Sequence, residues 1–244
     1  MTASEEIREA LARVAELRQL ANTPGELARA LRSIKHLQAQ RFAGTYPDLL
    51  ANPTFAPSIS FFLEELYSAK DYSDRDAQFA RIAPAMERTF PESVITTVRT
   101  LAVLHRQTEE LDLAMAHAWC ETSGLSDTAR YLTAWRSVDQ RSERNWQLAT
   151  VLHIGESLGR LTRKPGLRLL LKMMRRPAEI AGLGSLQGFL EAGFDHFSGM
   201  ANSGAVNTFL DTIRTRESAW INQLFDADLA TCESELTLTL GFSP

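Results

Sequence analysis

The segment from Phe61 to Pro91, FFLEELYSAKDYSDRDAQFARIAPAMERTFP, contains the clearest structural signals in this chain. Ile59, Phe62, Leu63 and Leu66 recur at spacings of three and four residues, which places them on one face of a helix. Such a face has to be buried against other helices. The segment therefore predicts an architecture, a helical domain arranged around it, and specifies no chemistry.

A second helix is expected to begin at the middle of this segment. Ser73 is expected to cap it, because a serine hydroxyl can accept a hydrogen bond from a free backbone N–H of the first turn. Asp74 and Asp76 add negative charge at the positive end of the helix dipole. Pro84 is expected to bend the helix because proline lacks an N–H group. The predicted apolar stripe consists of Phe79, Ile82 and Met86.

The same segment carries a family resemblance. Its motif consists of FFL, LY, Asp71, SxRD at 73–76, QFxRI at 78–82, Pro84 and FP at 90–91, and it continues in GLxxLQxFLExGF at 182–194 and FLxTIxxRE at 209–217. This pattern, over roughly residues 56–225, resembles an uncharacterised family of bacterial hypothetical proteins. The resemblance implies a helical fold and transfers no activity or site. Ser68-Ala69 stand where that family usually has Gly-Pro, so a looser turn is expected before Asp71.

Composition excludes several classes of protein. The chain has 244 residues, 44% of them hydrophobic and 23% charged, as in ordinary globular proteins. Its net charge of −4 argues against a protein that coats nucleic acid. The acidic N-terminal sequence is unlike a secretory signal, and no apolar run approaches the ~20 residues of a membrane span. Cys120 and Cys232 form neither a disulfide framework nor a CxxC pair, so a bacterial cytoplasm is predicted.

The order of helical patterns predicts the domain organisation. Residues 1–43 are expected to form a helical hairpin, whose second helix opens with a capping box at 23–26. The proline-containing segment 44–57 is a connection with one helical turn, and 58–225 form the main domain. The tail, 226–244, contains a period-two Leu-Thr pattern without a second strand and is expected to be disordered. We predict an all-α bundle of about eight to ten helices.

Glu217 interrupts the apolar stripe of the predicted helix from about residue 203 to 225. A carboxylate on a core face needs a donor, because an unpaired buried charge is costly. An ion pair with an arginine on a facing helix is therefore predicted, in preference to a catalytic or ligand-binding role.

Gly155-Glu156-Ser157-Leu158-Gly159 matches the GxSxG motif of serine hydrolases. That motif requires a strand before the serine and a helix after it, whereas Leu148, Val151 and Leu152 continue into the motif at helical spacing. Ser157 is therefore expected in the middle of a helix, with the two glycines at a close helix contact. A hydrolase built on Ser157 remains a remote alternative.

His153 and His196 are the candidate haem or metal ligands. Both have apolar neighbours, as an axial ligand in a haem pocket would, although a histidine bordering any helical core has them too. Two ExxH motifs for a di-iron site are absent from the sequence. The helical neighbours His105 and Glu109 are expected to form a surface pair, and Glu109-Glu110 a solvated face.

The strongest local anomaly is a run of positive charge in an acidic protein. No acidic residue lies between Glu156 and Glu179, and four of the basic residues recur at every fourth position. We call the following seven residues the basic ridge: Arg160, Arg163, Lys164, Arg168, Lys172, Arg175 and Arg176. If Pro165 breaks the helix, two basic clusters are expected in place of a continuous ridge.

The basic ridge favours a non-enzymatic binding or interaction protein as the leading hypothesis. It could hold an anionic ligand, a membrane surface, a nucleic-acid backbone or a protein partner, or it could pair with acidic helices of the same chain. Homo-oligomerisation is possible. No cofactor is specified, and a haem or metal protein using His153 or His196 is the alternative.

Overall fold

The computed structural model describes residues 1–22, 24–65, 72–122 and 124–241. These residues form twelve helices and no strand, which confirms the all-α prediction. The predicted number of eight to ten helices is too low, because the short helices α3 and α12 were not counted. No helix in the described ranges is long and apolar enough to cross a membrane.

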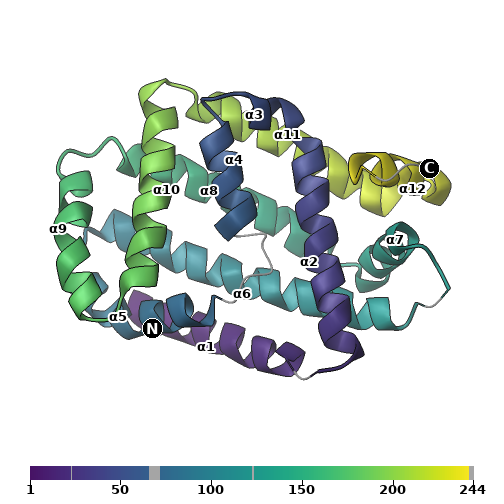
Figure 1. Cartoon of the computed structure of the whole chain (residues 1–244), viewed down its shortest axis with the longest axis horizontal. Helices are drawn as coiled ribbons and strands as arrows, with labels where there is room; N and C mark the ends of the chain where they lie inside the picture. The colour runs from purple at the N-terminus through teal and green to yellow at the C-terminus, as the bar shows by residue number, and fades with distance from the viewer. Residues whose placement is uncertain (23, 66–71, 123, 242–244) are drawn as a thin grey trace.

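The helices follow one another with short connections (Figure 1). Their bounds are α1 Ala3–Asn22, α2 Glu26–Thr45, α3 Pro47–Ala51, α4 Ala56–Glu65, α5 Ser73–Thr89, α6 Glu92–Cys120, α7 Asp127–Val138, α8 Arg141–Leu161, α9 Leu167–Ile180, α10 Gly184–Asn202, α11 Val206–Asp226 and α12 Leu229–Thr239.

Helix α6 is the centre of the fold. It has 29 residues, crosses the middle of the molecule in Figure 1, and packs against α1, α2, α7 and α8. Leu104, Leu111, Met115 and Trp119 are buried along one side of α6. Because these side chains recur at three- and four-residue spacing, one face of α6 supplies core to helices from both halves of the chain.

Three clusters of buried side chains make up the core, and the N-terminal helices α1 and α2 contribute to all three. Ile7 of α1 packs in a cluster with residues of α5, α6 and α10. Ile34 of α2 packs in a second cluster with residues of α6, α7, α11 and α12. The division into a hairpin at 1–43, a connection at 44–57 and a main domain at 58–225 stays a prediction.

Helix α5 begins one residue earlier than the predicted cap implies. Ser73 is the first residue of α5 and Tyr72 occupies the N-cap position, so the prediction that Ser73 caps the helix is wrong. The helix continues beyond Pro84 to Thr89. Four predicted features lie outside the described residues: Leu66 and the LY motif, the turn at Ser68-Ala69, Asp71, and Thr23 of the capping box.

The tail contains a helix where disorder was expected. In α12, Leu236 and Leu240 are buried while Leu238 is 63% exposed, which is helical and not strand periodicity. Helix α12 packs on α7 and on α2, where a Cβ added to Gly44 would lie 1.9 Å from the carbonyl oxygen of Thr239. Glycine at position 44 therefore permits this close approach.

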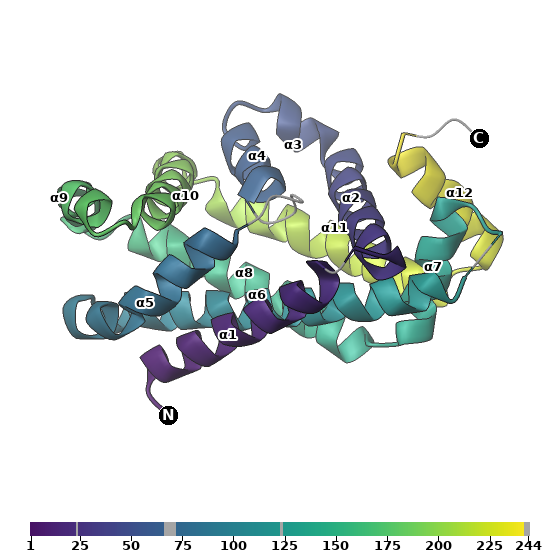
Figure 2. The same ribbon diagram turned by 60° about the horizontal axis from the view of Figure 1, so that its bottom comes forward.

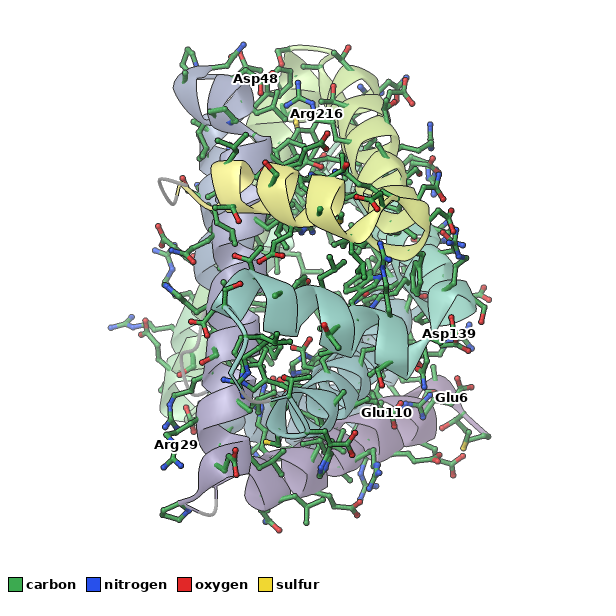
Figure 3. The ribbon with its side chains drawn as sticks, turned by 90° about the vertical axis from the view of Figure 1, so that its right-hand side faces the viewer. Glu6, Arg29, Asp48, Glu110, Asp139 and Arg216 are labelled. Carbon is green, nitrogen blue, oxygen red and sulfur yellow. The ribbon has the colours of Figure 1, made fainter. Side chains whose placement is uncertain are left out.

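The short helix α3 is tied to α11 by an exposed ion pair. Arg216 of α11 donates to both carboxylate oxygens of Asp48, at 2.6 and 2.8 Å, and Figure 3 shows these two side chains next to each other. The hydrogen bond from Arg216 lowers the pKa of Asp48 to about 2. Arg216 also donates to the Thr45 carbonyl, so it fixes the end of α2 as well.

Candidate functional site

A cavity of about 450 Å³ lies among α1, α2, α4, α5, α6, α7, α8, α10 and α11. Figures 1 and 2 show these helices arranged around the long α6. Pockets for small molecules in proteins typically have volumes of about 300–1,000 Å³. Most of the lining is apolar, with charged side chains concentrated on one wall. This cavity is the candidate functional site.

The charged wall is built on one face of α6. His105, Glu109 and Asp112 follow at spacings of four and three residues, so their side chains project from the same face. Arg18 of α1 crosses to this face, with its guanidinium 3.2 Å from Glu109 and 3.1 Å from the His105 ring. Arg18 also donates to Asp76 of α5 at 2.7 Å, and Asp76 lies 3.0 Å from His105.

Helix α2 completes this wall from the opposite side. Lys35 donates to Glu109 at 2.8 Å, and Gln38 donates to Asp112 at 3.0 Å. Glu109 and Asp112 are both buried, so each carboxylate depends on these donors for solvation. Throughout, the term polar wall means the set Arg18, Lys35, Gln38, Asp76, His105, Glu109 and Asp112.

The pKa values of the carboxyl groups in the polar wall are shifted in opposite directions. Burial alone would raise the pKa of Asp76, but the hydrogen bond with His105 and the charge of Arg18 bring that pKa below its ordinary value. Burial also opposes ionisation of Glu109, and Lys35 lowers its pKa below the ordinary value. The pKa of Asp112 is raised, because its burial outweighs the attraction of Lys35 and Glu109 repels its charge. Asp112 therefore takes up a proton more readily than its neighbours.

A second polar group borders the cavity at α11. Arg41 of α2 donates to both oxygens of Glu217, at 3.1 and 2.8 Å, and the Tyr46 hydroxyl donates to Glu217 at 2.9 Å. Arg41 is the facing arginine that the sequence predicted for Glu217. The role of this pair is therefore to bind α2 to α11 with its charges compensated.

Two polar groups of α7 are buried at the cavity without a hydrogen-bond partner. Among the described residues, no acceptor or donor lies within reach of the Tyr131 hydroxyl or of Trp135 Nε1. Tyr131 is 1% exposed and Trp135 is 7% exposed, and both line the cavity. Their ring centroids lie 6.0 Å apart, one helical turn along α7. Leaving such a group unsatisfied costs about 1–3 kcal/mol.

Another part of the cavity lining is apolar and aromatic. Phe62 of α4 lies parallel to Phe209 of α11, with centroids 6.4 Å apart. Phe189 of α10 stacks on Phe61, and the Arg75 guanidinium lies 4.5 Å from the Phe189 centroid. The lining of the cavity thus offers both rings for an apolar body and charged groups.

The basic ridge lies elsewhere, on the surface of α8 and α9 and the connection between them. Helix α8 ends at Leu161 and α9 begins at Leu167, so the ridge is broken near Pro165 into the two clusters that the sequence allowed. All seven side chains are on exposed residues. Arg168 pairs with Asp195 and Arg175 with Glu191, both on α10.

The residues of the hydrolase and haem alternatives do not meet in the cavity. Ser157 lies inside α8, where its hydroxyl accepts from Arg160. His153 is exposed on α8, whereas His196 is half-buried on α10 beside Phe61. Within the described ranges, no group of three or more His, Cys, Asp or Glu is arranged to hold a metal ion. Neither alternative gains support.

The GxSxG glycines belong to the packing of α8 on α11. A Cβ at Gly155 would lie 2.6 Å from a methyl group of Leu210, and one at Gly159 would lie 3.1 Å from a methyl of Val206. The expected close helix contact is therefore present, made by side chains of α11 that fill the space at the two glycines. The motif is accounted for by packing.

Sequence reasoning missed most of the polar wall. His105 and Glu109 were expected to form a surface pair and Glu109-Glu110 a solvated face, but Glu109 is 5% exposed and bound by Arg18 and Lys35. A signal was available: the polar stripe 105, 109, 112 borders the apolar stripe of α6 directly, so it had to lie at the edge of the core. Its partners on α1 and α2 carry no comparable signal.

The fold and this site define an all-helical protein with an internal cavity that combines a compensated charged wall with an apolar part. The chain belongs to a family described as a domain of unknown function, DUF8198, whose model matches residues 17–231. This match is consistent with the uncharacterised family that the sequence motifs resemble. Neither a curated protein nor a solved structure matches the chain.

Proposed function

We propose that this protein is a non-enzymatic binding protein whose central cavity holds a small amphipathic molecule bearing an anionic group. The observation that carries the proposal is the pair of buried polar groups on α7, of Tyr131 and Trp135, that have no hydrogen-bond partner within the described residues. An indole N–H is a donor and cannot accept, so a ligand that satisfies Trp135 must present an acceptor. A carboxylate, sulfonate or phosphate oxygen meets this need.

The charges around the cavity support the binding of an anionic ligand. Its described lining residues include six basic and four acidic side chains. The raised pKa of Asp112 reduces the negative charge further where that side chain is protonated. An anion would offset the remaining positive charge, whereas a cation would add to it.

The apolar part of the lining supports a ligand with a hydrophobic body. Phe62, Phe189 and Phe209 contribute rings that an aryl or aliphatic group can pack against. The volume of about 450 Å³ suits a molecule of small-metabolite size and leaves no room for a polymer. An aromatic or medium-chain aliphatic acid therefore fits both parts of the lining.

The test compares matched ligands. The purified protein is examined by native mass spectrometry and isothermal calorimetry against aryl and alkyl carboxylates, and against the amides and alcohols with the same carbon skeletons. We expect the carboxylates to bind and the neutral analogues to bind at least tenfold more weakly, because a charged hydrogen bond contributes about 1.5–3 kcal/mol. Equal affinity for both sets, or no binding by any acid, would overturn the proposal.

A pair of tyrosine variants localises the binding. Tyr131→Phe removes the hydroxyl in the cavity and is expected to weaken carboxylate binding about fivefold or more. Tyr46→Phe is the control, because Tyr46 is also fully buried but is not among the residues that line the cavity. The control variant should bind the carboxylate as the unmodified protein does.

The basic ridge is proposed as a second binding surface, for an anionic partner outside the chain. All seven residues are exposed, and within the described residues only Arg168 and Arg175 form ion pairs, which supports this proposal. Homo-oligomerisation and the cytoplasmic location stay predictions.

A further inference from the structure

Helix α9 carries an exposed apolar stripe beside its basic residues. Leu169, Met173 and Ile180 are 62, 67 and 85% exposed, which makes them three of the most exposed large hydrophobic side chains in the described chain. With about 100° of rotation per residue, these three positions fall within about 40° of one another around the helix. They form one continuous stripe on the side of α9 that faces away from α10.

The inner face of α9 is used for packing. Ala178 is buried, and Leu167, Leu170, Leu171 and Met174 are half-buried on the side that contacts α10. Helix α9 thus has two apolar faces, one satisfied by α10 and one open. The open face is not needed to hold α9 in place, because the inner face and the ion pairs to α10 already do so.

The basic residues of α9 divide according to these two faces. Arg168 and Arg175, nearer the inner face, pair with Asp195 and Glu191 of α10. Lys172 and Arg176 lie nearer the exposed stripe, and no ion pair or hydrogen bond to them is found within the described residues. Two cations therefore lie beside the exposed stripe, and neither has a carboxylate partner within the described residues.

We infer that the outer face of α9, formed by Leu169, Lys172, Met173, Arg176 and Ile180, docks on the surface of an anionic lipid bilayer. An interfacial helix places apolar side chains at the boundary of headgroups and acyl chains and its Lys and Arg side chains among anionic headgroups. Long basic side chains reach outward while their methylene stems stay apolar. The alternation of bulky aliphatic and cationic side chains on one face is what such a surface requires.

The position of α9 in the molecule makes this contact possible. Figures 1 and 2 show α9 at one end of the molecule, outside α10 and at the opposite end from α12. A helix of 14 residues is about 21 Å long, so it can lie flat in the interface with its length in contact. Arg163 and Lys164, exposed in the connection before α9, add charge near its beginning.

The exposed stripe distinguishes a bilayer from nucleic acid. Binding to a phosphate backbone uses cations and gains nothing from exposed leucine, methionine and isoleucine side chains. The whole chain carries −4, so attraction to an anionic surface has to be local and oriented, with α9 facing the surface. This inference does not depend on the cavity or on its ligand.

Vesicle sedimentation tests the inference with the full-length protein. The vesicles contain phosphatidylcholine alone or with about 30% phosphatidylserine, in low and in high salt. We expect the protein to cosediment with the anionic vesicles and to bind neutral vesicles at least tenfold more weakly. High salt should strongly reduce binding to the anionic vesicles, because each Lys or Arg near such a surface contributes electrostatic attraction that salt screens.

Two sets of variants separate the charged and apolar contributions. K172E with R176E should lower binding to anionic vesicles about tenfold or more. L169S with M173S and I180S should lower it to a similar extent while the remaining binding keeps its salt dependence. All five positions are exposed, so the fold should be unchanged, which circular dichroism checks.

A matched charge reversal supplies the control. R8E with R29E changes the net charge by the same amount at two exposed positions on α1 and α2. This variant should bind vesicles nearly as well as the unmodified protein. Absence of vesicle binding, equal binding to neutral vesicles, equal loss in the control, or retention of duplex DNA in place of vesicles would each overturn the inference.

Discussion

Removal of a hydroxyl group from Tyr131 should leave the protein as stable as before, whereas the same change at Tyr46 should destabilise it. Both side chains are fully buried, at 1 and 0% exposure, so the two substitutions to phenylalanine remove the same atom from similar surroundings. They differ in bonding. Tyr46 donates to the charged Glu217 at 2.9 Å, and the Tyr131 hydroxyl has no partner among the described residues.

The expected magnitudes follow from that difference. A hydrogen bond to a charged group contributes about 1.5–3 kcal/mol, so Tyr46→Phe should lower the free energy of unfolding by about 2 kcal/mol. Tyr131→Phe removes no bond and relieves the burial of an unsatisfied polar atom, so the change should lie between zero and a gain of about 1 kcal/mol. The variants should therefore differ by about 2 kcal/mol or more.

Urea denaturation of the ligand-free protein measures this difference, with unchanged m-values as the check that the unfolding transition itself is the same. For a chain of this size the difference corresponds to roughly 4–8 °C in Tm. If Tyr131→Phe costs as much as Tyr46→Phe, the Tyr131 hydroxyl is satisfied in the folded protein, and the reasoning that assigns it to a ligand fails.

Three further changes test the packing and charges of the fold. Asp112→Asn should stabilise the protein more at pH 8 than at pH 4, because the pKa of Asp112 is raised and the folded state loses stability as pH rises through it. Gly44→Ala should push α12 away from α2 and expose Cys232, which is 0% exposed, to a thiol reagent. Glu217→Gln should lower the free energy of unfolding by about 3 kcal/mol, because it removes the negative charge that pairs with buried Arg41.

Each of these changes has its own control. Asp76→Asn should show the opposite pH dependence, since the lowered pKa of Asp76 adds stability that is present at neutral pH and lost as pH falls through the folded-state pKa. If pH changed the stability of Asp112→Asn and Asp76→Asn in the same direction, the opposite pKa shifts of Asp112 and Asp76 would be contradicted. Gly199→Ala, also in a helix but with open space at its Cβ, should leave Cys232 protected, with Cys120 replaced by serine in both. For Glu217, a loss under about 1 kcal/mol would mean that its ion pair is largely solvated.

The helices could be predicted from the sequence because their signals are local. The stripe of α6, the α8–α11 contact at Gly155 and Gly159, and the ion pair of Glu217 each follow from spacing along one helix. The expectation of a disordered tail also rested on a local signal, which pointed away from the helix that the structure contains. An alternating Leu-Thr pattern satisfies period two, and the burial of Leu236 by α7 and α2 decides for a helix only in three dimensions.

The cavity could not be predicted, because its chemistry depends on residues that are far apart in the chain. Arg18, Asp76 and Glu109 are ordinary charged residues of three separate helices until folding brings them within hydrogen-bond distance. The missing partner of Tyr131 is likewise a property of the packed surroundings and not of α7. On α9, in contrast, the basic residues were visible in sequence, and only the exposure of Leu169 and Met173 required the structure.

The cavity draws its walls from Leu11 near one end of the chain to Ile221 near the other. A ribosome has to release nearly all of the chain before this chamber can close, so no early folding intermediate contains it. Loss of α1 or of α11 would remove part of its lining. A molecule held inside would consequently be retained only after α1 and α11 have both taken their places around it.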